Sequence, residues 1–358
     1  MALPYCYRTM VNGLKGRSFL TIQNYTPHEI SFLIDLSRKL KQRKDQARHF
    51  GVQGNLLAGL NIVLIFDKVS TRTRCSFEIA VNDEGGGVTF LSGSHMGQKE
   101  SVEDTAIVLG KMYDGIEFRG FAHEDVERIA DHAKVPVWNG LTNLHHPTQA
   151  LADFMTATEY IDKPFHEMKI VFVGDAANNV AYSLMITAAK LGAKFVALCP
   201  PTRRPEMDIV RMVREAYGGT VECYDIASRR QALAGADVVY TDVWVSMGEE
   251  HLFDERIREL QPYQVDVSMM MDTQNENCKF LHCLPAFHDL NTSVGRHVHE
   301  KYGLSAMECS DEVFRSERSV VFEQAANRVH TIKAVMVATV GHLERRAPDS
   351  LDQLAITG

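Results

Sequence analysis

The chain has 358 residues, 45% of them apolar and 23% charged, with a formal net charge of −8. This length is sufficient for two domains of ordinary size, and the composition is typical of a globular protein. A negative charge balance with a pI of about 6.0 argues against a broadly basic surface for nucleic acid, so any functional positive charge must be local. No apolar stretch is long enough to span a bilayer, and the first 20 residues lack the continuous apolar segment of a secretory signal.

The seven cysteines are scattered along the chain, and none of them forms a C-x-x-C pair. An odd number without paired spacing is typical of free thiols in a reducing compartment, so we expect a cytoplasmic protein without a disulfide framework. The N-terminal stretch carries three basic residues and no acidic residue before Glu29. Because only about 16 residues precede the first segment that looks folded, a short arm is favoured over a transit peptide.

The first clear helix begins after Thr26, where Pro27 and Glu29 complete a capping pattern and leucines then recur at helical spacing. Short apolar runs that favour strands follow, alternating with helical segments. In the first half we predict strands at 61–66, 88–91, 116–119 and 135–138, and a helix over about 146–160. In the second half we predict strands at 169–174, 194–199, 220–224, 237–243 and 279–284, and a long final helix at about 321–345.

This alternation of strands and helices predicts two α/β domains, each a doubly wound parallel sheet with helices on both faces. We expect the first domain to span residues 1–150 and the second 151–322, joined by interdomain helices, with the C-terminal helix of about 323–345 packing back on the first. Ligands of such sheets bind beyond the carboxyl ends of the strands. The candidate active site is therefore expected in the cleft between the two domains, built from residues that follow each strand.

A basic, hydroxyl-rich segment, KVSTRTR, follows the first predicted strand and opens a helix. Backbone N–H groups at a helix N-terminus, hydroxyl donors and arginine guanidiniums together suit a phosphate group. A capped helix with solvated arginines is the other interpretation, and this segment alone supports both interpretations equally. Arg119 ends the third strand and would lie beside the segment if the two strands are neighbours.

The segment that follows the fourth strand, WNGLTNLHHPTQ, places His146 and Gln149 three residues apart at a helix start. The two side chains therefore share a face and could polarise a carbonyl oxygen, although a helix cap without a chemical role is also possible. A metal site at His145 and His146 is disfavoured because adjacent side chains diverge. The loop that carries His95 is predicted to be a surface loop.

The second half presents polar residues after its own strands. The segment VGDAANN lacks the G-x-G-x-x-G pattern, which disfavours a dinucleotide, and its Asn178 and Asn179 could bind a polar ligand. Asp242 at a strand end suits an ammonium group, and the turn from Ser246 through Met247 to Gly248 could close over a ligand. A basic half-site and an amino-acid half-site together indicate group transfer from an acyl-phosphate-like donor to an amine.

The last strand runs into HCLPAFHD, whose His282, Cys283 and His288 suggest zinc. We expect no metal, because His282 and Cys283 should alternate across the strand and one loop histidine adds too few ligands. Covalent catalysis by Cys283 is likewise disfavoured, because no base paired with the thiol is evident.

Five motifs, STRTR, HPTQ, TDVWVSMGE, HCLPAFHD and ANRVHTIKAVM, resemble those of the ornithine carbamoyltransferases, within the aspartate/ornithine carbamoyltransferase superfamily. The resemblance runs from about residue 18 to 340, and the first two motifs are shared with aspartate carbamoyltransferases. It implies transfer from carbamoyl phosphate to ornithine without a metal or organic cofactor, in a homotrimer or a multiple of trimers whose His95 loop reaches the neighbouring site. It implies a carbamoyl phosphate site of Ser70, Thr71, Arg72, Thr73, His95, Arg119, His146, Pro147, Thr148, Gln149, Cys283, Leu284 and Arg328, an ornithine site of Asn179, Asp242, Ser246 and Met247, and catalytic roles for Arg119, His146, Gln149, Asp242 and Cys283.

The sequence departs from the family pattern at Ala177, where many relatives carry arginine, and at His145, which replaces an aromatic residue. Two other functions stay open. A carbamoyltransferase for putrescine is disfavoured by the Ser-Met-Gly turn, because putrescine has no α-carboxylate to bind. A non-catalytic binding protein is disfavoured by the intact set of arginines with His146, Asp242 and Cys283. The residues do not distinguish arginine biosynthesis from arginine breakdown through the deiminase pathway.

Overall fold

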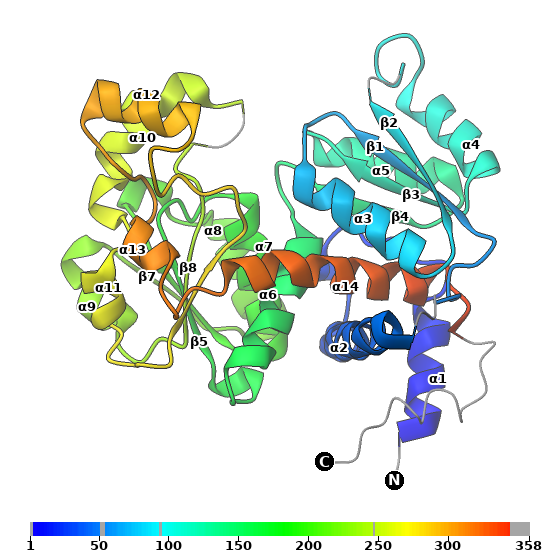
Figure 1. Ribbon diagram of the computed structural model, residues 1–358, viewed down its shortest axis with the longest axis horizontal. Coiled ribbons are helices and arrows are strands. Elements are labelled where there is room, and N and C mark those ends of the chain that lie inside the picture. The colour runs from blue at the N-terminus through cyan, green and yellow to red at the C-terminus, as the bar shows by residue number, and fades with distance from the viewer. Residues whose placement is uncertain (1–2, 51–53, 93–94, 246–247, 344–358) are drawn as a thin grey trace. The chain divides into compact units, whose positions relative to one another are not determined.

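The computed structural model describes residues 3–50, 54–92, 95–245 and 248–343. It divides into two compact units (Figure 1), one of residues 1–155 and 326–358 and the other of residues 156–325. Each unit is built on one parallel β-sheet, so the predicted α/β class with two parallel-sheet domains is confirmed. The divisions between the units fall inside helices α6 (Pro147–Tyr160) and α14 (Val321–Thr339).

The sheet of the first unit has the strand order β2-β1-β3-β4, and every pair is parallel. The predicted strands are found close to their expected positions except the last, which was expected at 135–138 and begins at Val137. Pro136 has no N–H to give to a strand ladder, so pairing starts after it. The strands are β1 (Asn61–Phe66), β2 (Gly87–Ser92), β3 (Gly115–Arg119) and β4 (Val137–Leu141).

Helices cover both faces of this sheet. On one face, α4 and α5 bury an apolar core with β1 and β3 that includes Val63, Phe118 and Ile129. On the other face, the indole N–H of Trp138 donates to Thr339 Oγ1 of α14 at 3.0 Å. The N-terminal helix α1 was not predicted, because we interpreted this stretch as a short arm. The helices of this unit are α1 (Leu3–Leu14), α2 (Pro27–Phe50), α3 (Thr71–Asp83), α4 (Val102–Met112) and α5 (His123–Ala133), with parts of α6 and α14.

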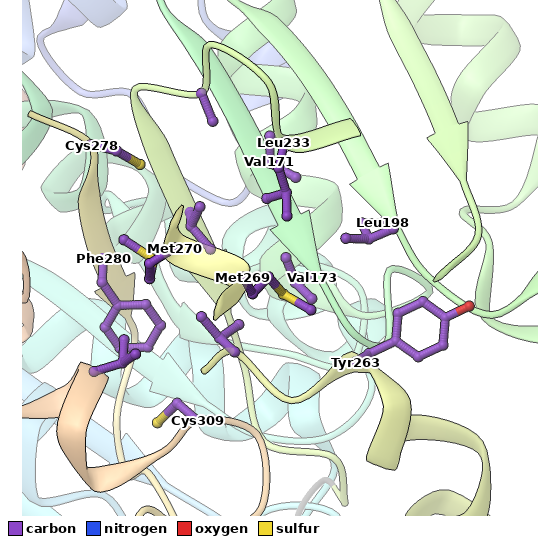
Figure 2. Packing of buried hydrophobic residues seen from close by; sticks show 14 of the residues in the cluster. Val171, Val173, Leu198, Leu233, Tyr263, Met269, Met270, Cys278, Phe280 and Cys309 are labelled. Carbon is purple, nitrogen blue, oxygen red and sulfur yellow. The ribbon is translucent and has the colours of Figure 1, made fainter. Parts of the chain in front are cut away.

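The second unit has the strand order β7-β6-β5-β8-β9, again all parallel. Figure 2 shows the core on one face, where β-branched side chains of β5 meet the methionines of α11. The strands are β5 (Lys169–Val173), β6 (Lys194–Leu198), β7 (Val221–Tyr224), β8 (Val238–Thr241) and β9 (Lys279–His282). The helices are α7 (Asn179–Leu191), α8 (Met207–Tyr217), α9 (Arg229–Leu233), α10 (Phe253–Leu260), α11 (Val267–Met271), α12 (Ser293–Tyr302) and α13 (Asp311–Phe314).

The order of the strands decides where each unit can bind a ligand. In the first sheet the chain continues from β1 to β2 on one side and to β3 on the other, so the loops after β1 and β3 diverge. In the second sheet β5 has the same position between β6 and β8. Such reversals create a crevice at the carboxyl ends of the strands. No helix in the described part of the chain combines the length and apolarity needed to cross a membrane.

Candidate active site

The loop after β1 leads directly into the N-terminus of α3, as the sequence indicates. Ser70 is the N-cap of this helix, and its Oγ accepts a hydrogen bond from the Thr73 backbone N–H at 3.2 Å. Thr71 begins the helix and is exposed, while Thr73 in the first turn is fully buried. The cap therefore holds the first turn in place and leaves its N-terminal N–H groups directed out of the helix, where they favour an anion.

Two arginines from distant parts of the chain meet at Thr73. Arg119 at the end of β3 donates from Nη1 to Thr73 Oγ1 at 3.3 Å, and Arg328 of α14 donates from Nη2 to the same oxygen at 2.9 Å. Arg328 Nη2 also reaches Thr148 Oγ1, at 3.4 Å. The register that pairs Phe66 with Arg119 shows that β1 and β3 are neighbours, which was the condition for this arrangement.

His146 lies next to this set of arginines. Its side chain is buried, and burial, reinforced by the charges of Arg328, Arg119 and Arg72, places the pKa of His146 well below its usual range. The imidazole is therefore neutral at physiological pH, with one N–H available as a hydrogen-bond donor. We call Arg72, Arg119 and Arg328 the arginine cluster. A neutral donor beside three guanidiniums suits a ligand that carries both a phosphate and a carbonyl oxygen.

The orientation of the Gln149 amide is fixed by its own helix. Gln149 Nε2 donates to Asp153 Oδ1 at 2.8 Å, four residues along α6, and both side chains are buried. Because a carboxylate accepts hydrogen bonds, the amide NH2 must face Asp153. Gln149 Oε1 is left buried without a hydrogen-bond partner among the described residues. This oxygen is an acceptor that suits the NH2 group of a carbamoyl compound. Asp153 was missed in the sequence analysis, although its spacing of four from Gln149 is a usable signal.

Some of the expected site residues are not brought to these clusters. His95 is exposed, and no hydrogen bond or ion pair in the described part of the chain joins its side chain to the arginine cluster. Its carbonyl oxygen instead accepts the N–H groups of the turn that follows, including Gln98 at 3.0 Å. Ser246 and Met247 lie outside the described residues. Pro147 is the first residue of α6, in keeping with a proline at a helix start.

In the second unit, Asp242 and Cys283 lie just beyond neighbouring strands β8 and β9. The Cys283 thiol donates to Asp242 Oδ1 at 3.0 Å, and Asn178 Nδ2 lies 3.4 Å from Asp242 Oδ2. Burial raises the pKa of the Asp242 carboxyl, while nearby His282 and the Cys283 hydrogen bond act against that rise. An acceptor for the thiol proton is thus present, which the sequence analysis had not found. Asn179, the expected ligand, is the first residue of α7, and Asn178 caps it.

His282 positions the segment that carries Cys283. Its Nδ1 accepts the Leu284 N–H at 2.9 Å, so the ring proton is on Nε2, which lies 3.3 Å from Glu308 Oε1. Leu284 adopts a φ of 59°, which allows its N–H to turn back toward the ring. Both nitrogens of this fully buried ring therefore already face protein groups.

The prediction that His282 and Cys283 alternate across the strand, which disfavoured a metal, is wrong. Strand β9 ends at His282, so Cys283 does not alternate with it, and candidate ligand atoms of Asp242, His282 and Cys283 lie within 4.8 Å of one another. A bound metal ion would have to break the Nδ1 hydrogen bond of His282 or displace Glu308. His288, the third residue of the zinc pattern, is not part of this group; its Nδ1 lies 2.7 Å from Asp311 Oδ1.

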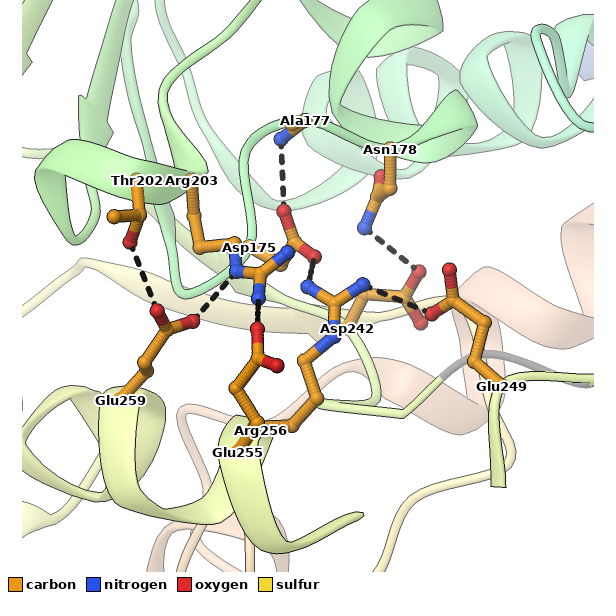
Figure 3. A network of polar contacts seen from close by, with 10 residues as sticks. All are labelled: Asp175, Ala177, Asn178, Thr202, Arg203, Asp242, Glu249, Glu255, Arg256 and Glu259. Carbon is orange, nitrogen blue, oxygen red and sulfur yellow. Dashed lines mark hydrogen bonds and ion pairs between the residues drawn. The ribbon is translucent and has the colours of Figure 1, made fainter. Parts of the chain in front are cut away.

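A buried ion pair supports the loops around Asp242 (Figure 3). The Arg256 guanidinium of α10 contacts Asp175 in the β5–α7 loop, and its Nη2 donates to Glu249 Oε2 at 3.0 Å. Glu249 follows the Ser-Met-Gly turn in sequence, while Asp175 Oδ1 accepts the Ala177 N–H at 3.0 Å. Arg256 thus joins the β5–α7 loop to the segment after β8 that begins with Asp242. Neither Arg256 nor Asp175 was predicted from the sequence, because they are 81 residues apart and no local pattern links them.

Comparisons with known proteins match nearly the whole chain. Residues 17–159 match the family model described as aspartate/ornithine carbamoyltransferase, carbamoyl-P binding domain, and residues 166–339 match the Asp/Orn binding domain of the same family. A catabolic ornithine carbamoyltransferase from Clostridium perfringens is 54% identical over 93% of this chain and 100% of that protein. A protein with the same name from Bacillus cereus is 50% identical over 93% of this chain and 98% of its own length. The solved ornithine carbamoyltransferase from Pyrococcus furiosus has a TM-score of 0.79 at 36% identity, covering 91% of this chain and 98% of that one.

Proposed function

Because the chain belongs to the aspartate/ornithine carbamoyltransferase family, we propose that it transfers the carbamoyl group of carbamoyl phosphate to the δ-amine of L-ornithine, giving L-citrulline and phosphate. The observation that carries this proposal is the meeting of Arg119 and Arg328 at Thr73 on the N-terminus of α3. This arrangement offers a dianionic phosphoryl group two buried guanidiniums together with the N–H groups of a helix start. The relatives that cover the chain carry the same activity in their names.

The first unit would hold the donor. Ser70, Thr71, Arg72 and Thr73 bind the phosphate, helped by Arg119, Thr148 and Arg328. The remaining donor groups are His146, Pro147 and Gln149, with Cys283 and Leu284 from the second unit and His95 from a neighbouring subunit. The neutral imidazole of His146 donates to the carbonyl oxygen, and the unpaired Gln149 Oε1 accepts the carbamoyl NH2. This unit matches the family model of the carbamoyl-P binding domain, which supports placing the donor here.

The second unit would hold the acceptor, through Asn179, Asp242, Ser246 and Met247. A free alkyl amine has a pKa of roughly 10.4, so the site must provide it in its unprotonated form before attack. Asp242, hydrogen-bonded to Cys283, orients the amine and accepts one of its protons. The nitrogen then forms a bond to the carbonyl carbon, and Arg119 and His146 stabilise the oxyanion that develops. The C–O bond to phosphate breaks while the attacking nitrogen gives up its remaining extra proton to the departing oxygen, so phosphate leaves as HPO4²⁻, a dianion that the arginine cluster stabilises.

Activity assays of purified protein test this proposal. Citrulline should form from carbamoyl phosphate and L-ornithine, and carbamoylated product from putrescine or N-acetylornithine should be slower by at least a factor of about 100. Arg72→Ala should abolish turnover in a folded protein. Arg128→Ala, on the outer helix α5, serves as the matched control because its partly exposed guanidinium lies away from the cluster. Wild-type turnover in Arg72→Ala, or preference for putrescine, contradicts the proposal.

A homotrimer in the cytoplasm, or a multiple of trimers, completes the proposal. Helix α4 exposes the apolar side chains of Ile107, Val108 and Met112, at 39%, 48% and 65%, directly after the loop that holds His95. An interface there would bury this apolar surface and bring a neighbouring loop to the donor site. The six cysteines whose side chains the structure describes are all free thiols, as in a reducing compartment. Sedimentation should give three times the chain mass or a multiple of that mass, and Val108→Asp should dissociate the assembly. A fully active monomer contradicts this.

A further inference from the structure

A buried carboxyl group lies behind the arginine cluster. Glu117 occupies the middle of β3, paired with Leu64 of β1 and Trp138 of β4. Its side chain is fully buried, and neither carboxyl oxygen has a hydrogen-bond partner among the residues that the structure describes. A buried carboxyl without partners is costly and needs a reason. Because Glu117 and Arg119 are two residues apart on one strand, their side chains lie on the same face of the sheet.

A bulge in the neighbouring strand makes room for this carboxyl. The register of β3 against β4 shifts between Phe118 and Arg119, so that Gly140 is the extra residue on β4. A methyl group on Gly140 would lie 2.0 Å from Glu117 Oε1 and 3.2 Å from Thr73 Cγ2. The absence of a side chain at Gly140 therefore leaves the space that the Glu117 carboxyl occupies. It also shows that this carboxyl is a neighbour of Thr73, on which Arg119 and Arg328 converge.

The charges that act on Glu117 come from two elements, because Arg119 shares its strand and Arg328 is on α14. His146, just before α6, is neutral, and Arg72 on α3 acts on His146. Burial raises the pKa of the Glu117 carboxyl well above its ordinary value, and the attraction of Arg119 and Arg328 for the carboxylate acts against that rise. The protonated form thus leaves the guanidiniums their full charge, whereas the ionised form competes with a bound anion for the same two arginines.

We propose that Glu117 is a positioning residue for the phosphoryl group. When its carboxyl is protonated, Arg119 and Arg328 can bind the dianion with their full charge. When it is ionised, the carboxylate attracts both guanidiniums and weakens their binding of the dianion. This inference rests on the proposed carbamoyl phosphate site and adds a proton requirement to it. At pH values where Glu117 is ionised in the empty site, binding of a dianion is therefore accompanied by uptake of a proton at Glu117. As pH rises through the ionisation of Glu117, affinity for the phosphoryl group falls.

Inorganic phosphate, the proposed product, is a suitable probe, because it is already a dianion above about pH 8 and adds no titration of its own there. Its dissociation constant should be measured by calorimetry from pH 8 to 9.5 for the wild-type chain, Glu117→Gln and Glu124→Gln. Glu124 is an exposed residue of α5, and its variant is the control. The wild type and the control should bind phosphate more weakly by up to about 10-fold per pH unit once Glu117 ionises. Glu117→Gln should show a flat profile, because an amide does not ionise.

A second measurement needs only the wild-type chain. Phosphate binding should be measured in two buffers that differ in ionisation enthalpy, at the pH values where wild-type affinity falls, which reports the number of protons taken up. A measurable uptake of up to one proton is expected. Parallel pH profiles for wild type and Glu117→Gln, or zero uptake in the wild type, overturn the proposal. Failure of the proposed function is a different result, because the wild-type chain would then form no citrulline at any pH.

Discussion

The Cys283 thiol and the Asp242 carboxylate are hydrogen-bonded at 3.0 Å, across the ends of two neighbouring parallel strands. They are 41 residues apart in the chain, and each follows the last residue of its strand. A partly buried carboxylate acceptor and a sulfur donor are thereby held together.

Asp242→Asn should lower kcat/KM for ornithine by on the order of 10²–10⁴-fold, because an amide cannot accept the proton of the attacking amine. Phosphate affinity, which depends on the first unit, should stay within about 2-fold of wild type. Steady-state kinetics and phosphate titration measure the two effects. Asp208→Asn on α8, where the carboxylate is 89% exposed, is the matched control. A variant at Asp242 that keeps wild-type ornithine kinetics would remove this residue from the mechanism.

Asp153→Asn should raise the KM for carbamoyl phosphate by about 10-fold, the cost of one misaligned hydrogen bond. Asparagine can present either an oxygen or an NH2 to Gln149, so the Gln149 amide would lose its fixed orientation. The KM for ornithine should change little. Asp131→Asn on α5 changes the same functional group at an exposed position and should be silent. A rise confined to the ornithine KM would show that Gln149 does not bind the donor.

Arg256→Met should destabilise the second unit by roughly 3–5 kcal/mol, because it leaves a buried Asp175 carboxylate without its guanidinium. The KM for ornithine should also rise, since Glu249 would no longer be tied to the β5–α7 loop. Urea unfolding measures the first effect. Adding Asp175→Asn to the same chain should restore most of the lost free energy of unfolding, as removing both charges of a pair is less costly than removing one. Equal losses in the single and double variants would mean that the ion pair is not responsible.

The free energy of unfolding should fall as pH drops from about 6.5 to about 4, in part through His145. Burial, with a smaller contribution from His123, lowers the pKa of His145 to about 4, whereas the unfolded chain has the ordinary value of about 6.5. Between these values the unfolded state binds the extra proton, so acid favours unfolding by up to about 3 kcal/mol from this residue.

His145→Phe should flatten that part of the pH profile, because the phenyl ring can occupy the edge-to-face position against His123 and carries no proton. Chemical unfolding at pH 7.5, 6, 5 and 4.5 measures the slope. His28→Gln, at an exposed position on α2, should leave the profile unchanged. An equally steep profile in His145→Phe would assign the acid sensitivity to other groups, such as His330, whose pKa is lowered to about 3 by burial.

The sequence by itself determined the α/β class, because strand-like apolar runs and capped helices are local patterns, and it indicated that the functional residues follow the strands. The hydroxyl cap at Ser70 and the helix start at Pro147 could be located in the same way. The boundaries of the strands were less certain. The last two strands proved shorter than expected, and this error led to the wrong inference that His282 and Cys283 diverge.

Only the tertiary structure decided which of these residues meet. Thr73 lies 46 residues from Arg119 and 255 from Arg328, and only the strand order β2-β1-β3-β4 with the return of α14 brings both guanidiniums to one oxygen. The burial of Glu117 depends on a bulge at Gly140, and the Arg256–Asp175 pair joins elements that share no sequence pattern. Local propensity is encoded over a few neighbouring residues, whereas burial and charge pairing depend on contacts between segments far apart in the chain.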